Sequence, residues 1–158
     1  MHKFCCLLVS QQFIGNLNVQ TKSVSFYVQR KSEFALYDAI IPFQSARLNE
    51  GDAFNLTSGV FTVPINGIYI FQFSALKEST AHTLAIRLQV NGENVGSAYT
   101  SKSISEPKVK GTEESISLSA SLRLAAGDKV NLRNYGALYD DHNHYTHFIG
   151  WLVEEDLM

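Results

Sequence analysis

Two aspartates and three histidines lie close together near the end of the sequence: Asp140, Asp141, His142, His144 and His147. Imidazole binds zinc and titrates near neutral pH, so this group could form a zinc site or a pH sensor. A zinc site needs three or four ligands in a tetrahedral arrangement, and histidines two positions apart on a strand converge only with help from a loop or a partner chain. We favour the other interpretation, a polar surface loop with no metal bound.

Asn55 begins the tripeptide Asn-Leu-Thr, which is an N-glycosylation sequon. In a secreted protein an exposed Asn55 could carry a glycan. Asparagine also forms turns through side-chain hydrogen bonds to the backbone nearby. We favour the structural role for Asn55 and keep glycosylation as the alternative.

No spacing of reactive residues in the sequence suggests catalysis, and we predict no catalytic residue. The only cysteines, Cys5 and Cys6, lie near the start of the chain. Neither a Gly-x-Ser-x-Gly nucleophile turn nor a phosphate-binding glycine loop is present. Neighbouring acids such as Glu113 and Glu114 more often mark solvated loops than acid–base pairs. We therefore expect a protein that is not an enzyme and that has no cofactor.

The composition excludes several other classes. The 158 residues are enough for one domain whose core needs neither metal nor disulfide. Lys and Arg number 13 and Asp and Glu 15, for a net charge of −2, so the basic excess of a nucleic-acid binder is missing. No segment approaches the ~20 apolar residues of a membrane span. Charged residues make up only 18% of the chain, below the usual ~25%, which suggests surface hidden by subunit contact.

Residues 1–22 are predicted to be a lead segment, followed by one domain over residues 23–158. The lead has a short basic start and a brief apolar run before Ser10, which resembles a secretory signal peptide. Typical apolar regions of signal peptides have 7–15 residues, and no small-x-small cleavage site follows. The alternatives are an export signal and an incomplete or disordered N-terminus. Adjacent Cys5 and Cys6 cannot build an internal disulfide framework.

Apolar and polar residues alternate with a period of two along most of the remaining chain, which predicts β-strands. The segments 67–77, 84–90 and 116–124 show this alternation most clearly. Asn91-Gly92 predicts a hairpin turn before a strand over about 94–100. The polar segment 101–115 is expected to be a long loop. Eight to ten short strands with no helical pattern indicate an antiparallel sandwich or barrel.

A fixed pattern of aromatic residues, one asparagine and one glycine runs through the first half of the domain. Its eight positions are Phe43, Asn49, Phe54, Phe61, Gly67, Tyr69, Phe71 and Phe73. The types and spacings resemble the signature of the complement C1q globular-head domain. Four further stretches, 24–28, 59–64, 127–132 and 148–152, resemble other strands of that family. These residues specify a fold and no reaction, and we expect Gly67 to permit a turn into its strand.

The resemblance implies an all-β, antiparallel, ten-stranded jelly-roll sandwich of the C1q and tumour necrosis factor type. It also implies an extracellular, secreted homotrimer that recognises ligands on its outer surface. In small members without a collagen stalk, the usual role is pattern recognition of microbial surface carbohydrate or lipopolysaccharide in innate immunity. The alternatives are a head that binds a receptor or organises extracellular matrix, and a head fragment of a longer collagen-stalked protein.

Some members of the family bind calcium near the trimer apex through an Asp-Gln pair that precedes the strand expected here to begin near Ile116. The matching positions here hold Glu114 and Ser115. The carboxylate is retained in type but the amide oxygen is not, and calcium favours six to eight oxygen ligands. We therefore assign no metal site from the resemblance.

Overall fold

The structure, a computed structural model, describes residues 22–101 and 113–157. Most of the predicted lead, with its two cysteines, lies outside the described residues, as does most of the predicted loop over 101–115. Twelve strands are described: β1 (Ser25–Gln29), β2 (Ala39–Ile40), β3 (Ser45–Glu50), β4 (Phe54–Asn55), β5 (Val60–Thr62), β6 (Gly67–Lys77), β7 (Thr83–Val90), β8 (Glu93–Ser101), β9 (Ser115–Leu124), β10 (Lys129–Gly136), β11 (Leu138–Tyr139) and β12 (His147–Glu155).

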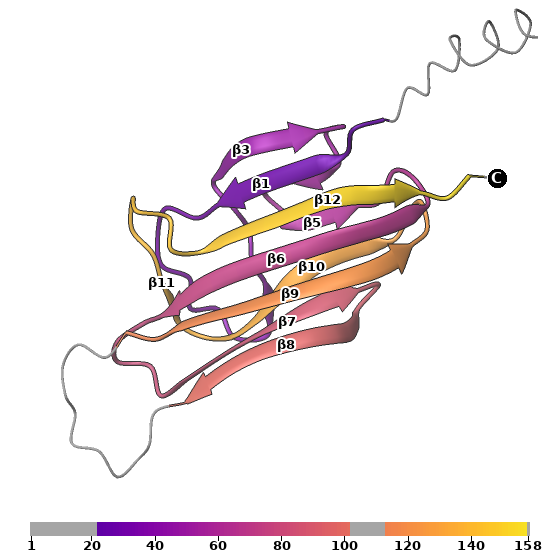
Figure 1. Ribbon diagram of the computed structural model, residues 1–158. Coiled ribbons are helices and arrows are strands. Elements are labelled where there is room, and N and C mark those ends of the chain that lie inside the picture. The colour runs from indigo at the N-terminus through magenta and orange to yellow at the C-terminus, as the bar shows by residue number, and fades with distance from the viewer. Residues whose placement is uncertain (1–21, 102–112, 158) are drawn as a thin grey trace, which may run out of the picture.

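The strands form two antiparallel sheets of six strands each (Figure 1). Sheet A contains β9, β6, β12, β1 and β3, with β11 pairing along β6 beyond β12. Sheet B contains β4, β5, β10, β7 and β8, with β2 also pairing to β10. The predicted all-β antiparallel jelly roll is confirmed. The count of ten strands is approximate, because β2, β4 and β11 have only two residues each.

The core lies between the two sheets and is built by strand alternation. On β6 the side chains of Tyr69, Phe71 and Phe73 point inward and are 0–3% exposed. Phe26 on β1 lies at the centre of an aromatic cluster. Its ring centroid is 4.7 Å from that of Phe54, and it also packs against three other phenyl rings, those of Phe61, Phe71 and Phe148. Aromatic pairs in such tilted and edge-on geometries stabilise a core beyond simple area burial.

Asn49 connects the two sheets. It lies on β3 of sheet A, and its side-chain amide donates to the carbonyl oxygen of Phe54 on β4 of sheet B at 3.0 Å. Its Oδ1 accepts a hydrogen bond from the Phe54 backbone N–H at 3.2 Å. The four residues between Asn49 and Phe54 therefore form a closed turn, which gives the spacing a physical reason.

Gly67 directly follows a bend at residues 65–66. It is the first residue of β6 and pairs with Glu155 of β12. A Cβ at this position would stand 2.2 Å from the carbonyl oxygen of Glu154 and 2.8 Å from the Leu152 side chain. The glycine therefore permits a close approach of two backbones within sheet A at the point where the chain enters β6.

The two ends of the sandwich differ in what they carry. Both ends of the described chain lie at one end (Figure 1), where Lys22 and Glu155 line one shallow depression. At the opposite end β6 leads to β7 and β11 leads to β12. Ser101 and Glu113, where the two described ranges of the chain end and begin, lie at that opposite end as well.

Candidate interaction surface

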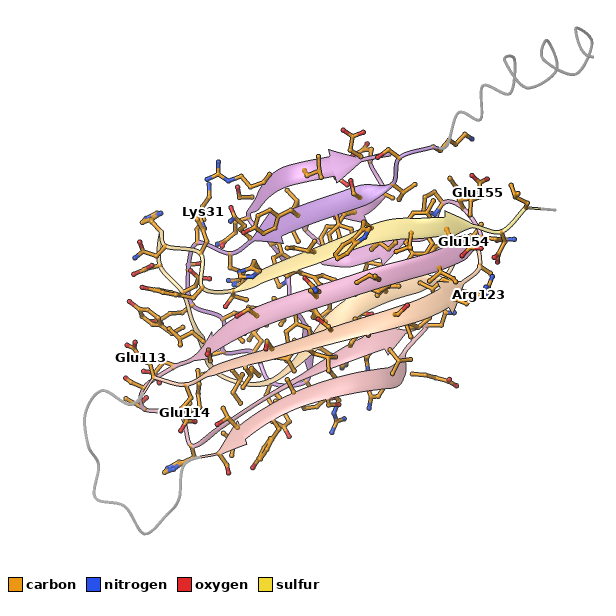
Figure 2. All side chains as sticks on the ribbon, viewed as in Figure 1. Lys31, Glu113, Glu114, Arg123, Glu154 and Glu155 are labelled. Carbon is orange, nitrogen blue, oxygen red and sulfur yellow. The ribbon has the colours of Figure 1, made fainter. Side chains whose placement is uncertain are left out.

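The outer face of sheet A is the candidate surface, and it looks toward the viewer in Figures 1 and 2. Its centre consists of side chains that alternate with core residues on β9, β6, β12 and β1. None of these central positions carries an acid, a lysine or an arginine. They are Ser117, Ser119, Ser121, Ile70, Gln72, Ser74, His147, Ile149, Trp151, Ser25, Tyr27 and Gln29.

Apolar side chains run across the middle of this face. Ile70 on β6 lies opposite Trp151 on β12, and Ile149 lies opposite Tyr27 on β1. All four are half-buried by their neighbours within the sheet, and no helix covers them in residues 22–101 and 113–157. The strip extends toward the rim through Leu48, whose side chain is 42% exposed.

Charged residues mark the two ends of the same face. Figure 2 shows Arg123, Glu154 and Glu155 together at the end that carries the termini. Glu113 and Glu114 lie at the opposite end. A surface with an apolar, weakly polar centre and charges at its rim matches the usual anatomy of a protein–protein interface.

Sequence reasoning noted Ile70 as an apolar residue on the second face of its strand but missed Ile149 and Trp151. The signal was available in β12, where Ile149 and Trp151 alternate with the core residues Phe148 and Leu152. A strand that is apolar at consecutive positions departs from the inward–outward alternation of a strand with one solvated face. Such a strand is expected where both faces of a sheet are covered.

Asp140, Asp141, His142 and His144 of the predicted group lie in the loop that joins β11 to β12, and His147 is the first residue of β12. His144 Nδ1 lies 2.7 Å from the carbonyl oxygen of Arg30, and the Asp141 carboxylate accepts a hydrogen bond from the Asn143 backbone. His142 is exposed. Among the described residues, no three or more His, Cys, Asp or Glu side chains are arranged to hold a metal ion.

Arg30 and Asp140 are two buried charged residues at this loop. Arg30 donates hydrogen bonds to the carbonyl oxygens of Ser32, Pro42 and Glu33. Burial lowers the pKa of Arg30, and the negative charge of Asp140 opposes that effect. Asp140 Oδ2 accepts from a backbone N–H of the same loop at 2.7 Å. The Asp140 carboxylate therefore holds this loop, whereas the Arg30 guanidinium holds the segment between β1 and β3, and the sequence indicated neither role.

The remaining site predictions fall on separate parts of the surface. Asn55 is exposed, and its side-chain oxygen accepts a hydrogen bond from the backbone N–H of Ser58 at 3.0 Å. Glu114 accepts a hydrogen bond from Thr100 and lies 4.0 Å from the buried ammonium group of Lys77. The Glu114 carboxylate is thus already engaged by neighbouring side chains. The glycosylation of Asn55 stays the untested alternative to its structural role.

The comparison with protein families decides the relationship. The family model of the C1q domain matches residues 25–153, which is most of the chain. The chain belongs to the C1q domain family. The described residues of this C1q domain contain no helix that is long and apolar enough to cross a membrane.

Curated relatives agree with this relationship. The human complement C1q tumor necrosis factor-related protein 3 is 33% identical over 133 residues, which cover 84% of this C1q domain chain and 52% of the relative. Zebrafish Caprin-2 is 36% identical over 136 residues, which cover 84% of the chain and 14% of that protein. The chain therefore spans about half of the human relative and a small part of Caprin-2.

Solved structures show the same fold. The globular domain of zebrafish complement 1qA superposes with a TM-score of 0.68 at 24% identity, covering 84% of this chain and 99% of that one. The Eiger TNF structure from S. frugiperda superposes with a TM-score of 0.70 at 15% identity, covering 87% and 97%. The C1q and tumour necrosis factor type of jelly roll is thus shared.

Proposed function

We propose that this C1q domain is an extracellular, secreted recognition domain, without enzymatic activity, that assembles as a homotrimer through the outer face of sheet A. Its ligands are microbial surface carbohydrate or lipopolysaccharide, bound in innate immunity. The family assignment supports the class of ligand-binding domain, and the surface of the sandwich supports the assembly.

The observation that carries the assembly is the apolar strip through Ile70, Trp151 and Ile149. These side chains point away from the core of their own subunit. Association can bury them, and burial of apolar area is the main favourable term in association. The central positions around them contain serine, glutamine and tyrosine but no acid, lysine or arginine. Apposition of these central positions to another subunit therefore removes apolar surface from water and buries no acid, lysine or arginine of their own. Arg47 on β3, which donates a hydrogen bond to Gln29, borders the set. The number three follows from the family resemblance.

Trimeric assembly suits recognition of repetitive surfaces. Three copies of a weak site on one particle raise the overall affinity by effective concentration, without any new contact. Microbial glycans repeat at high density, so a trimer gains from them far more than from a single soluble sugar.

Two measurements test the proposal. Sedimentation equilibrium at micromolar concentration should give about three times the chain mass of 17.6 kDa, and a monomer at that concentration contradicts the assembly. The trimer should then bind bacteria or a microbial glycan array in a saturable manner. A folded trimer that gives a flat response in both assays would count against microbial recognition.

A second function is favoured by the 33% identity to the human tumor necrosis factor-related protein. In that case the domain is a signalling or matrix-organising head, or the head of a longer collagen-stalked protein, and it engages a protein receptor. Saturable binding to animal cells that no glycan competes would support this alternative.

A further inference from the structure

The outer face of sheet B carries a row of aromatic side chains across the strands. Tyr99 on β8 lies opposite Ala85 on β7, and Ala85 lies opposite Tyr135 on β10. The ring of Tyr37 then meets the ring of Tyr135 edge-on, with centroids 5.3 Å apart. Tyr37 is 74% exposed and Tyr99 is 64% exposed, so two rings are available to a partner.

A row of arginines runs beside the aromatic row. Arg87 on β7 lies opposite Arg133 on β10, two positions along from the Ala85–Tyr135 pair. The guanidinium carbon of Arg87 lies 4.2 Å from the centroid of the Tyr135 ring. This contact connects the two rows. We refer to Tyr37, Tyr99, Tyr135, Arg87 and Arg133 as the tyrosine–arginine face.

The charges of this face are nearly all positive. The charged residues at outward positions of β7 and β10 are Arg87, Arg133 and Lys129, and neither strand places an acid there. Asp38, in the turn before β2, pairs with Arg133 at 2.7 Å. That leaves a local excess of cations, although the whole chain has a net charge of −2.

Arg87 is the cation that is ready for a partner. Within residues 22–101 and 113–157 no carboxylate lies within ion-pair distance of it, and its guanidinium donates no hydrogen bond to a described residue. Its position is fixed nonetheless by the Tyr135 ring. A preorganised guanidinium with unused donors suits the paired oxygens of a carboxylate or sulfate.

We propose that the tyrosine–arginine face binds an acidic carbohydrate, a glycan chain that carries carboxylate or sulfate groups. The proposal rests on the proposed function as an extracellular recognition domain and names the ligand class and the binding surface. The anionic groups pair with Arg87 and with Arg133, and the apolar C–H faces of the sugar rings lie on Tyr37 and Tyr99.

The spacing of the rows supports an extended glycan. Tyr99 and Tyr135 are two strand spacings apart, about 10 Å, which is close to the length of one disaccharide unit. An acidic sugar presents flat C–H faces and projecting anionic groups together, so it can use an aromatic row and a cationic row at once. A peptide strand that extends a sheet pairs with the backbone of an edge strand. Tyr99 lies on the edge strand β8, but Arg87 and Tyr135 project from the outer face of the inner strands β7 and β10, which such a peptide would not cover.

Calorimetry with soluble oligosaccharides tests the proposal on the full chain. The probes are a sulfated tetrasaccharide, a tetrauronate and a neutral tetrasaccharide of equal length, and the first two separate sulfate from carboxylate recognition. We expect an acidic probe to bind and the neutral probe to fail. Arg87→Gln should weaken binding about tenfold, and Tyr37→Ala roughly threefold.

Matched controls remove the same groups elsewhere. Lys31→Gln deletes one positive charge from an exposed loop at one end of the sandwich, and Tyr145→Ala deletes one exposed ring from the loop before β12. Each should change the affinity less than twofold. Equal weakening by Arg87→Gln and Lys31→Gln would show diffuse charge attraction and overturn the proposal. So would acidic probes that fail to bind, or a glutamate-rich peptide that binds in their place and depends on Arg87.

The same variants separate this inference from the proposed function. If Arg87→Gln leaves bacterial or array binding intact, recognition stands and its assignment to the tyrosine–arginine face falls. If the folded trimer binds no ligand in any assay, the proposed function falls first, and the acidic glycan falls with it.

Discussion

The outer faces of the two sheets share one core and differ in nearly everything else. On sheet A the central outward positions hold serines and half-buried apolar residues such as Ile70 and Trp151. On sheet B the corresponding positions hold half-buried arginines and Tyr135, together with Tyr99 at 64% exposure. Neutral apolar surface favours contact with another subunit, whereas fixed cations and exposed rings favour a charged ligand.

The difference teaches where a jelly roll has freedom to change. Inward positions of both sheets must fill one close-packed interior, so their volumes are constrained together. Outward positions are constrained only by strand propensity and by their cross-strand neighbours. Assembly and ligand binding can therefore be assigned to opposite faces, and substitutions can address each face by itself.

Truncation of Phe26 should destabilise the sandwich that carries both faces. Phe26 is 1% exposed and contacts four phenyl rings from both sheets, so Phe26→Ala leaves a large cavity and should lower the free energy of unfolding by about 3–5 kcal/mol. Urea denaturation followed by circular dichroism measures the change. Tyr145→Ala is the control, because that ring is exposed in the loop before β12. A loss as small as that of the control would contradict the central position of Phe26.

A lysine placed on one face or the other should show which face forms the subunit contact. Ile70→Lys places a charge in the apolar strip of sheet A, where its desolvation opposes subunit contact, and we expect the trimer to become a monomer in sedimentation equilibrium. Val60→Lys places the same charge on an outward, half-buried position of sheet B, and the mass should not change. Dissociation by Val60→Lys alone would assign the interface to sheet B.

The Asn49 link between the sheets should have a smaller effect. Asn49→Ala removes both hydrogen bonds to the Phe54 backbone, and the free energy of unfolding should fall by about 1–3 kcal/mol. Thermal or urea denaturation provides the value. Asn55→Ala serves for comparison in protein from a host that does not glycosylate, because exposed Asn55 makes one side-chain bond within its turn. If both variants lose equal stability, Asn49 does not connect the sheets as described.

The smallest effect is expected at the ion pair of the tyrosine–arginine face. Hydrogen bonds from Arg133 and Tyr135 lower the pKa of Asp38. A lowered folded pKa means that the pair stabilises the fold above the unfolded pKa of ~3.9 and that this contribution is lost as the pH falls through the folded pKa. Carbon-detected NMR titration should show the Asp38 pKa rise toward its ordinary value in Arg133→Gln. An unchanged pKa in that variant would contradict the pairing.

Local patterns predicted a large part of the fold. The alternation in β6 and β9 identified the buried residues, and the hairpin turn was found because Asn91 and Gly92 tolerate the positive φ angles of 51° and 85° that they adopt. Contacts between distant segments gave no such signal. Asp38 meets Arg133 across 95 residues, and Gly67 is required by a backbone from another strand.

The candidate surfaces were harder to predict than the fold. The low content of charged residues suggested a hidden face, but its location requires the register that places Ile149 beside Tyr27. The tyrosine–arginine face joins residues from β8, β7, β10 and a loop, and no sequence window contains them together. The two-residue strands were missed because a pair of residues has no periodicity.

The placement of both described chain ends at one end of the sandwich affects how the domain can be presented. Lys22 and Leu157, the two ends of the described chain, both lie at that end, so a surface or tag linked close to either residue meets the same end of the sandwich. The loop that contains Asp140 and His144 lies at the opposite end of the sandwich. The tyrosine–arginine face lies on the outer face of sheet B, between the two ends. Attachment through either terminus is therefore the suitable way to display this domain for binding experiments.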